Sequence, residues 1–198
     1  MVEINSIEDL RPFMKYVPAK YVNGYFSYLS FEIVENGEVQ DVTINCELDL
    51  TFSMDNVFCD LFNVENMIAE DRLAEFCEIR LIAKNIYVKQ PLKIEHIKCD
   101  NIYFDQNVTI DVLVAYENVK GESIHSTDIM CDSLNAKYVY CNCINALKFR
   151  ARCLFGGDVF MENVTFHQPD FPEDLVNSWN GVKRDRYDLA KNTDSLPF

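Results

Sequence analysis

The sequence predicts an all-β fold, a single-stranded parallel β-helix in which short strands wind around a common axis. Apolar residues recur at every fifth position over about 50 residues, and none of these positions is polar. From residue 121 onward, the position two residues after each of them is small. A period of five fits neither the 3.6-residue period of an α-helix nor a long two-residue alternation, so it indicates short strands joined by regular corners. The bulky positions are Val114, Val119, Ile124, Ile129, Leu134, Val139, Ile144, Phe149, Leu154, Val159 and Val164.

The small positions suit the interior of such a winding, because a bulky aliphatic and a small side chain together fill a narrow core. They are Gly121, Ser126, Cys131, Ala136, Cys141, Ala146, Ala151 and Gly156. With four five-residue segments to a turn, residues 20 apart stack. This arrangement predicts Ile129 on Phe149 and Leu134 on Leu154.

The same pattern begins further upstream in another register. Leu92, Ile97 and Ile102 step by five, and the pattern shifts by two residues before Val114. A two-residue insertion at one corner between Phe104 and Val114 explains the shift. We expect the parallel β-helix to span residues 79–168, with Phe166 as its last repeat residue.

Five consecutive repeats resemble those of the pentapeptide-repeat proteins. They are Ile129-Met130-Cys131, Leu134-Asn135-Ala136, Val139-Tyr140-Cys141, Ile144-Asn145-Ala146 and Phe149-Arg150-Ala151. Here the small residue follows the large one by two, whereas in that family it precedes it by two. The resemblance implies a four-sided, right-handed β-helix. Some members of that family act as DNA mimics, which suggests a comparable role for an acidic chain.

Residues 1–78 predict an N-terminal cap made of a β-hairpin and short helices. Apolar residues alternate over 29–33 and 42–52, and Asn36-Gly37 between them is a turn signal. The alternation is lost over 55–78, where the spacing favours one or two short helices. A cap of this kind covers the apolar core and the unpaired strand groups at the end of a β-helix.

Residues 169–198 predict a C-terminal capping segment that completes one compact unit. The repeat stops at His167-Gln168-Pro169, and a short helix is expected from Pro172 to Trp179. Phe171 and Trp179 are suited to closing the second end. A partner-binding tail is the alternative interpretation.

Composition argues against a cofactor, a metal site and a membrane span. The eight cysteines include no Cys-x-x-Cys, and Cys131 and Cys141 occupy small inward positions. No charged-then-apolar leader and no membrane-length apolar run occur. We expect a cytoplasmic protein without a cofactor.

The acidic charge is concentrated in the N-terminal third. Residues 32–78 hold 13 acids and the single base Arg72, whereas residues 114–166 hold six acids and five bases. We expect this block to be either a solvated face or a surface for a partner protein with a basic groove, and it disfavours direct nucleic-acid binding. The predicted partner-binding acids are Glu35, Glu38, Asp41, Glu47, Asp49, Asp55, Asp60, Glu65, Glu70, Asp71, Glu75 and Glu78.

Two further surfaces are expected on the outside of the winding. Tyr140, Phe155 and Phe160 form an exposed aromatic strip, which predicts either a homodimer or a surface covered by the tail. Lys148, Arg150 and Arg152 share one outer wall, where cations usually prevent sideways aggregation and where they can also hold an acidic group.

Catalysis has little support in the sequence. His96, His125 and His167 are widely spaced, and neither a glycine-rich phosphate loop nor His-Glu-x-x-His occurs. The predicted function is therefore a non-enzymatic acidic protein-binding module, of which a DNA-mimic inhibitor of a basic nucleic-acid-handling protein, such as a topoisomerase or a phage-defence nuclease complex, is the specific form that we expect. A structural, homo-oligomeric β-helix and a carbohydrate-active β-helix enzyme are the alternatives.

Overall fold

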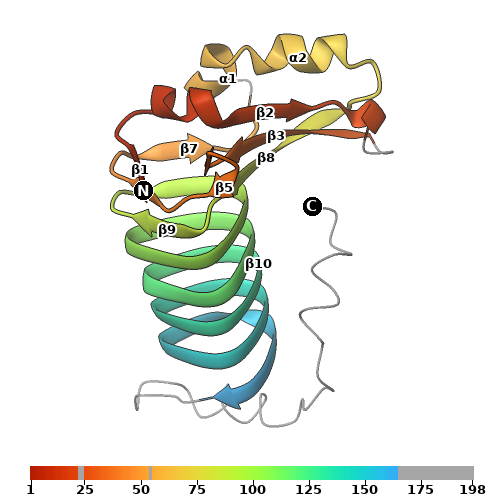
Figure 1. Ribbon diagram of the computed structural model, residues 1–198. Helices are drawn as coiled ribbons and strands as arrows, with labels where there is room; N and C mark the ends of the chain where they lie inside the picture. Colours follow the sequence, from red (N-terminus) through yellow and green to blue (C-terminus); the bar gives the residue numbers. More distant parts are fainter. Residues whose placement is uncertain (22–24, 54, 165–198) are drawn as a thin grey trace.

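The computed structural model describes residues 1–21, 25–53 and 55–164, and it shows a mostly β fold with a curled, mixed sheet (Figure 1). The side chains of residues 147, 152–153 and 155–164 lie outside this description, as does the capping segment expected at 169–198 with Phe171 and Trp179. The strands are β1 (Val2–Ile4), β2 (Met14–Val17), β3 (Phe26–Glu32), β4 (Val34–Glu35), β5 (Glu38–Val39), β6 (Val42–Ile44), β7 (Leu48–Leu50), β8 (Phe76–Ile82), β9 (Asn85–Val88) and β10 (Leu92–Val164). The helices are the 3-10 helices η1 (Ile7–Phe13) and η2 (Ala19–Tyr21) and the α-helices α1 (Val57–Leu61) and α2 (Val64–Glu70).

The main sheet has the order β1-β6-β9-β10-β8-β3-β2, and β7 pairs separately with β10. All of these pairings are parallel except β2 with β3. Strand β10 pairs with β7, β8 and β9 through three successive short stretches, because the chain turns a corner between them. Figure 1 shows β10 continuing below them through successive turns.

Burial confirms the predicted inward positions. Every bulky fifth residue from Val119 to Leu154 belongs to the buried core, as do the small residues from Cys131 to Ala151, whereas at the predicted position Val114 the core residues are its neighbours Leu113 and Ala115. Gly121 and Ser126 are half-buried, and the side chains of Val159 and Val164 lie outside the description. The five-residue period therefore identifies the side chains that build the core.

The number of residues in a turn differs from the prediction. Arg80 pairs with His96, the ring of His125 stacks on that of Tyr140 at 4.1 Å, and one hydrogen bond joins side chains 15 residues apart, from Lys137 to Glu122. Contacts between the successive turns of Figure 1 thus join residues 15 to 17 apart. The expected four-sided turn with residues 20 apart in stacks is wrong.

The register shift before Val114 also has a different form from the one expected. Val108, Ile110, Leu113 and Ala115 are all buried. The inward positions therefore run from Ile102 to Val108 and from Leu113 to Val119 with one residue more than five. Single extra residues at two corners replace the predicted two-residue insertion at one corner.

The predicted long hairpin between residues 29–33 and 42–52 does not form. Strand β3 pairs with β2 and with β8, and β6 pairs with β1 and β9. Only the two-residue strands β4 and β5 form a hairpin, around Asn36 and Gly37, whose φ angles of 54° and 80° suit a tight turn. Alternation predicted the buried faces correctly but not the partners, and parallel pairing extends upstream of residue 79.

Candidate functional site

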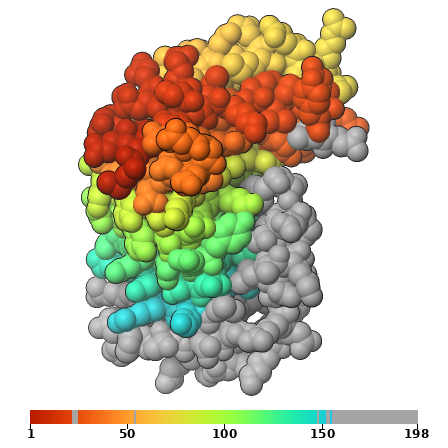
Figure 2. Space-filling model, viewed as in Figure 1, coloured from red at the N-terminus to blue at the C-terminus, as the bar shows by residue number. Residues whose placement is uncertain are grey.

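The predicted short helices are confirmed as α1 and α2, which lie at one end of the molecule (Figures 1 and 2). Asn63, with φ of 59°, separates them in a left-handed conformation that asparagine tolerates. Both helices belong to the segment between β7 and β8. This segment is an excursion from the wound chain, since its two flanking strands each pair with β10.

Aromatic packing fixes the helices to the core. Phe58 and Phe62 are fully or nearly fully buried, and the Phe62 ring lies 5.5 Å from that of Phe31 in β3. The guanidinium of Arg11 lies 4.9 Å from the centre of the Phe62 ring and donates a 2.9 Å hydrogen bond to the carbonyl of Leu61. The apolar side of this pair of helices therefore faces the core.

The opposite side carries carboxylates. We call the exposed acids of residues 55–75 the acidic cap; they are Asp55, Asp60, Glu65, Glu70 and Glu75. Arg72 is the only basic residue in this stretch. Val57, with 74% of its surface exposed, and Leu73, with 57%, are aliphatic side chains among them.

Asp71 is not part of this surface, contrary to the prediction. It is only 7% exposed and accepts a 2.5 Å hydrogen bond from the backbone N–H of Ala19 in η2. A buried carboxylate needs such donors to offset the loss of water. Asp71 thus joins the end of α2 to η2.

Asp41 and Asp49, two other predicted acids, also form hydrogen bonds or ion pairs with neighbouring side chains. Asp41 accepts a 2.7 Å hydrogen bond from Asn85. Asp49 accepts hydrogen bonds from Thr51 and forms a 3.4 Å ion pair with Lys93.

The half-buried Glu78 lies 2.7 Å from Arg80 and 3.7 Å from His96. Of the remaining acids, Glu35 and Glu38 are exposed on the β4–β5 hairpin and Glu47 is exposed before β7. The structure thus divides the predicted set and brings only the acidic cap together on one segment.

The polar cluster around Arg80 was not predicted. Its guanidinium lies 3.4 Å from the centre of the Tyr28 ring, and only 7% of the residue is exposed. Burial lowers the pKa of His96 below its usual value, although the charge of Glu78 raises it in part. Strand register brings these residues together from segments about 50 residues apart, and no local motif marks that register.

Glu95 is a second residue that the sequence did not reveal. Its carboxylate accepts hydrogen bonds from the backbone N–H groups of Phe52, at 2.8 Å, and Ile79, at 2.6 Å. Burial raises its pKa, and these two bonds lower it in part. Because Phe52 and Ile79 flank the helical excursion, Glu95 ties both of its ends to β10.

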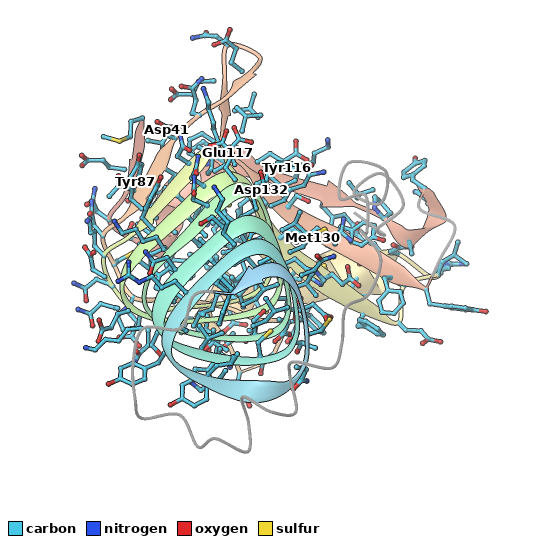
Figure 3. The ribbon with its side chains drawn as sticks, turned by 90° about the horizontal axis from the view of Figure 1, so that it is seen from below. Asp41, Tyr87, Tyr116, Glu117, Met130 and Asp132 are labelled. Carbon is cyan, nitrogen blue, oxygen red and sulfur yellow. The ribbon has the colours of Figure 1, made fainter. Side chains whose placement is uncertain are left out.

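The aromatic strip is described only in part. Tyr140 is half-buried and stacks on His125, whereas the side chains of Phe155 and Phe160 lie outside the description. Lys148 and Arg150 are exposed, and the side chain of Arg152 lies outside the description. Viewed along the winding, Asp41, Glu117 and Asp132 lie on its outside (Figure 3).

The described part of the chain contains neither a cluster of metal-binding side chains nor, among Cys77, Cys99, Cys131 and Cys141, a thiol of lowered pKa. No group of three or more histidine, cysteine, aspartate or glutamate side chains there could hold a metal ion. Burial raises the pKa of Cys77 and of Cys141 to about 12, and it raises that of Cys99 and Cys131 further. These thiols stay protonated near neutral pH and are weak nucleophiles.

Comparisons with protein-family models, with curated proteins and with solved structures found no match. Within residues 1–21, 25–53 and 55–164, no helix has the length and apolar character needed to cross a membrane.

Proposed function

We propose that this protein is a non-enzymatic binding module in which a parallel β-solenoid carries the acidic cap, and that the cap binds a basic surface on a partner protein. The observation that carries the proposal is the segregation of exposed acids. Five of them occupy one 21-residue excursion that has a single base. A coat that served only solubility would intersperse both signs of charge.

The aliphatic side chains favour a protein partner. Val57 and Leu73 are exposed among the carboxylates of the acidic cap. Protein interfaces typically combine a few apolar anchors with a charged rim that steers the encounter. We expect these two side chains to contribute affinity and the carboxylates to contribute association rate and selectivity.

The solenoid is the finer fold assignment, and three observations support it. Inward side chains recur at every fifth residue, contacts between turns join residues 15 to 17 apart, and the strands pair in parallel. In such a fold each turn contacts only its neighbours, so a stack of turns is a rigid support for an excursion at one end.

A nucleic-acid-handling protein is the partner class that we propose, because such proteins carry extended basic grooves. The carboxylates of the acidic cap do not form rows along strands, since Asp60, Glu65 and Glu70 lie on helices. Asp49 on β7 is strand-borne but paired with Lys93. The proposal therefore depends on charge density and not on mimicry of phosphate spacing.

The test is a pull-down from the native host with three forms of the protein at about 50 mM and 500 mM salt, where screening differs strongly. The cap variant is Asp60→Asn, Glu65→Gln and Glu70→Gln. The matched control, Glu3→Gln, Glu35→Gln and Glu38→Gln, removes the same charge from exposed acids outside the cap. We expect wild type and control to retain the same basic partner at low salt and the cap variant to lose it; retention by the cap variant at both salt concentrations would contradict the proposal.

A further inference from the structure

A second surface, away from the acidic cap, has the opposite charge character. One outer wall of the winding consists of β1, β6, β9 and residues 101–104 of β10, and Tyr87 in β9 points outward from it (Figure 3). Below these strands the wall is hollowed into a groove with a volume of about 790 Å³. The groove is lined by Phe104, Asp105, Lys120, Gly121, Glu122, Asn135, Ala136, Lys137, Arg150 and Ala151.

Small residues make the floor of this groove. Gly121, Ala136 and Ala151 follow one another at intervals of 15 residues, which is one turn. A side chain cannot replace the hydrogen of Gly121, because a Cβ atom there would collide with the ring and the carbonyl oxygen of Phe104. These three residues are inward positions, so the floor of the groove is their backbone, and its two sides are rows of outward side chains.

Charged side chains line both sides of the floor. Asp105 forms a 2.7 Å ion pair with Lys89, and Glu122 is paired with Lys137. Lys120 and Arg150 are exposed, and among the described residues neither has a carboxylate within ion-pair distance. The groove therefore presents two cations that form no ion pair with the described residues of the wall.

The two cations have a defined spacing. Lys120, Asn135 and Arg150 occupy equivalent positions on three successive turns. Neighbouring strands of a sheet lie about 4.8 Å apart, so the two cations are separated by roughly 10 Å along the winding. A ligand that satisfies both must carry at least two negative groups and extend along the groove.

The remaining lining groups indicate which kind of anion fits. The carboxylates of Asp105 and Glu122 can accept further hydrogen bonds, and the amide of Asn135 can both donate and accept. Hydroxyl groups of a ligand match these acceptors. Among the described lining residues Phe104 is the only large apolar one, and it is 2% exposed, so this lining offers none of the apolar side-chain pockets that usually hold an extended peptide.

We propose that this groove binds a short acidic oligosaccharide, with its carboxylates at Lys120 and Arg150 and its hydroxyl groups on Asp105, Glu122 and Asn135. The regular spacing of a sugar polymer suits a wall whose outward positions recur at every turn. The site is independent of the acidic cap, so loss of either one leaves the other testable.

The experiment is calorimetric titration of the full chain with a galacturonate hexamer at low salt. The variant Lys120→Gln/Arg150→Gln removes both cations, and Lys20→Gln/Lys84→Gln removes two exposed lysines outside the groove lining as the matched control. We expect the groove variant to bind about tenfold more weakly, since each exposed ion pair contributes modestly. The control should bind as wild type does, and affinity should fall as salt rises.

Three results would overturn the proposal. They are absence of saturable binding at millimolar hexamer, equal binding of an uncharged galactose oligomer, and equal binding of a glutamate hexapeptide. The last result would assign the groove to acidic peptides instead. Circular dichroism of all variants checks that a loss of binding is not a loss of fold.

Discussion

Phe62 links the acidic cap to the core, and its replacement by alanine tests that link. The ring is 2% exposed, packs 5.5 Å from Phe31 and lies beneath the guanidinium of Arg11. Truncation of a buried phenylalanine costs about 3–5 kcal/mol, because the transfer free energy is lost and a cavity remains. In that total, the aromatic pair accounts for about 1 kcal/mol and the cation–π contact for a smaller share.

Urea unfolding measures the effect of Phe62→Ala. With an m-value of about 2 kcal/mol/M, a loss of 4 kcal/mol lowers the unfolding midpoint by about 2 M. Hydrogen exchange should show faster exchange in residues 57–70, since the helices open first once their anchor is removed. The control Val57→Ala, at an exposed position of the adjoining helix α1, should change the free energy of unfolding by less than about 0.5 kcal/mol. A loss below 1 kcal/mol for Phe62→Ala would refute the proposed docking of the helices.

Three further predictions concern single residues of the wound chain. Glu95→Ala leaves two part-buried backbone N–H groups without their acceptor, so it should destabilise the fold by about 1–3 kcal/mol, whereas Glu47→Ala, at an exposed position, should have little effect on urea unfolding. Burial raises the pKa of Glu95, so the stability that its protonation contributes is present below the usual glutamate range and is lost as pH rises through the folded pKa. Glu95→Gln should abolish this part of the pH dependence of stability. An unchanged dependence of stability on pH would contradict the prediction. The pKa of His96 is lowered, so its contribution is present above pH of about 6.5 and is lost as pH falls toward its folded pKa; His96→Gln should flatten the decline of the melting temperature in that window. Gly121→Ala places a Cβ against Phe104 and should cost about 1–3 kcal/mol, and a melting temperature equal to that of wild type would show that the wall can relax there.

The interior of the fold was predictable because burial follows a local period. Each bulky fifth residue from Val114 to Leu154 is apolar whatever the number of sides, so the sequence marked the core correctly. For the same reason it could not determine the turn length. A period of five is compatible with three or four segments per turn, and the angle at each corner depends on packing between residues such as Phe104 and Gly121.

Pairing partners and buried acids were harder to predict because they depend on distant segments. The alternation over residues 29–33 showed which side chains of β3 face inward, but its partner β8 begins 50 residues later in the chain. In sequence Asp71 resembles any surface acid. The N–H group that donates a hydrogen bond to its carboxylate lies in η2, 52 residues away. The short helices were predictable because the loss of alternation over 55–78 is a local signal.

The most direct test of the turn length, on which the position of the groove depends, is a nuclear Overhauser measurement between aromatic rings. We expect strong cross-peaks between His125 and Tyr140, whose ring centres lie 4.1 Å apart, and between Tyr87 and Tyr103, whose ring centres lie 5.3 Å apart. Their absence, together with a cross-peak between Tyr140 and Phe160, would show a turn of 20 residues and contradict the account.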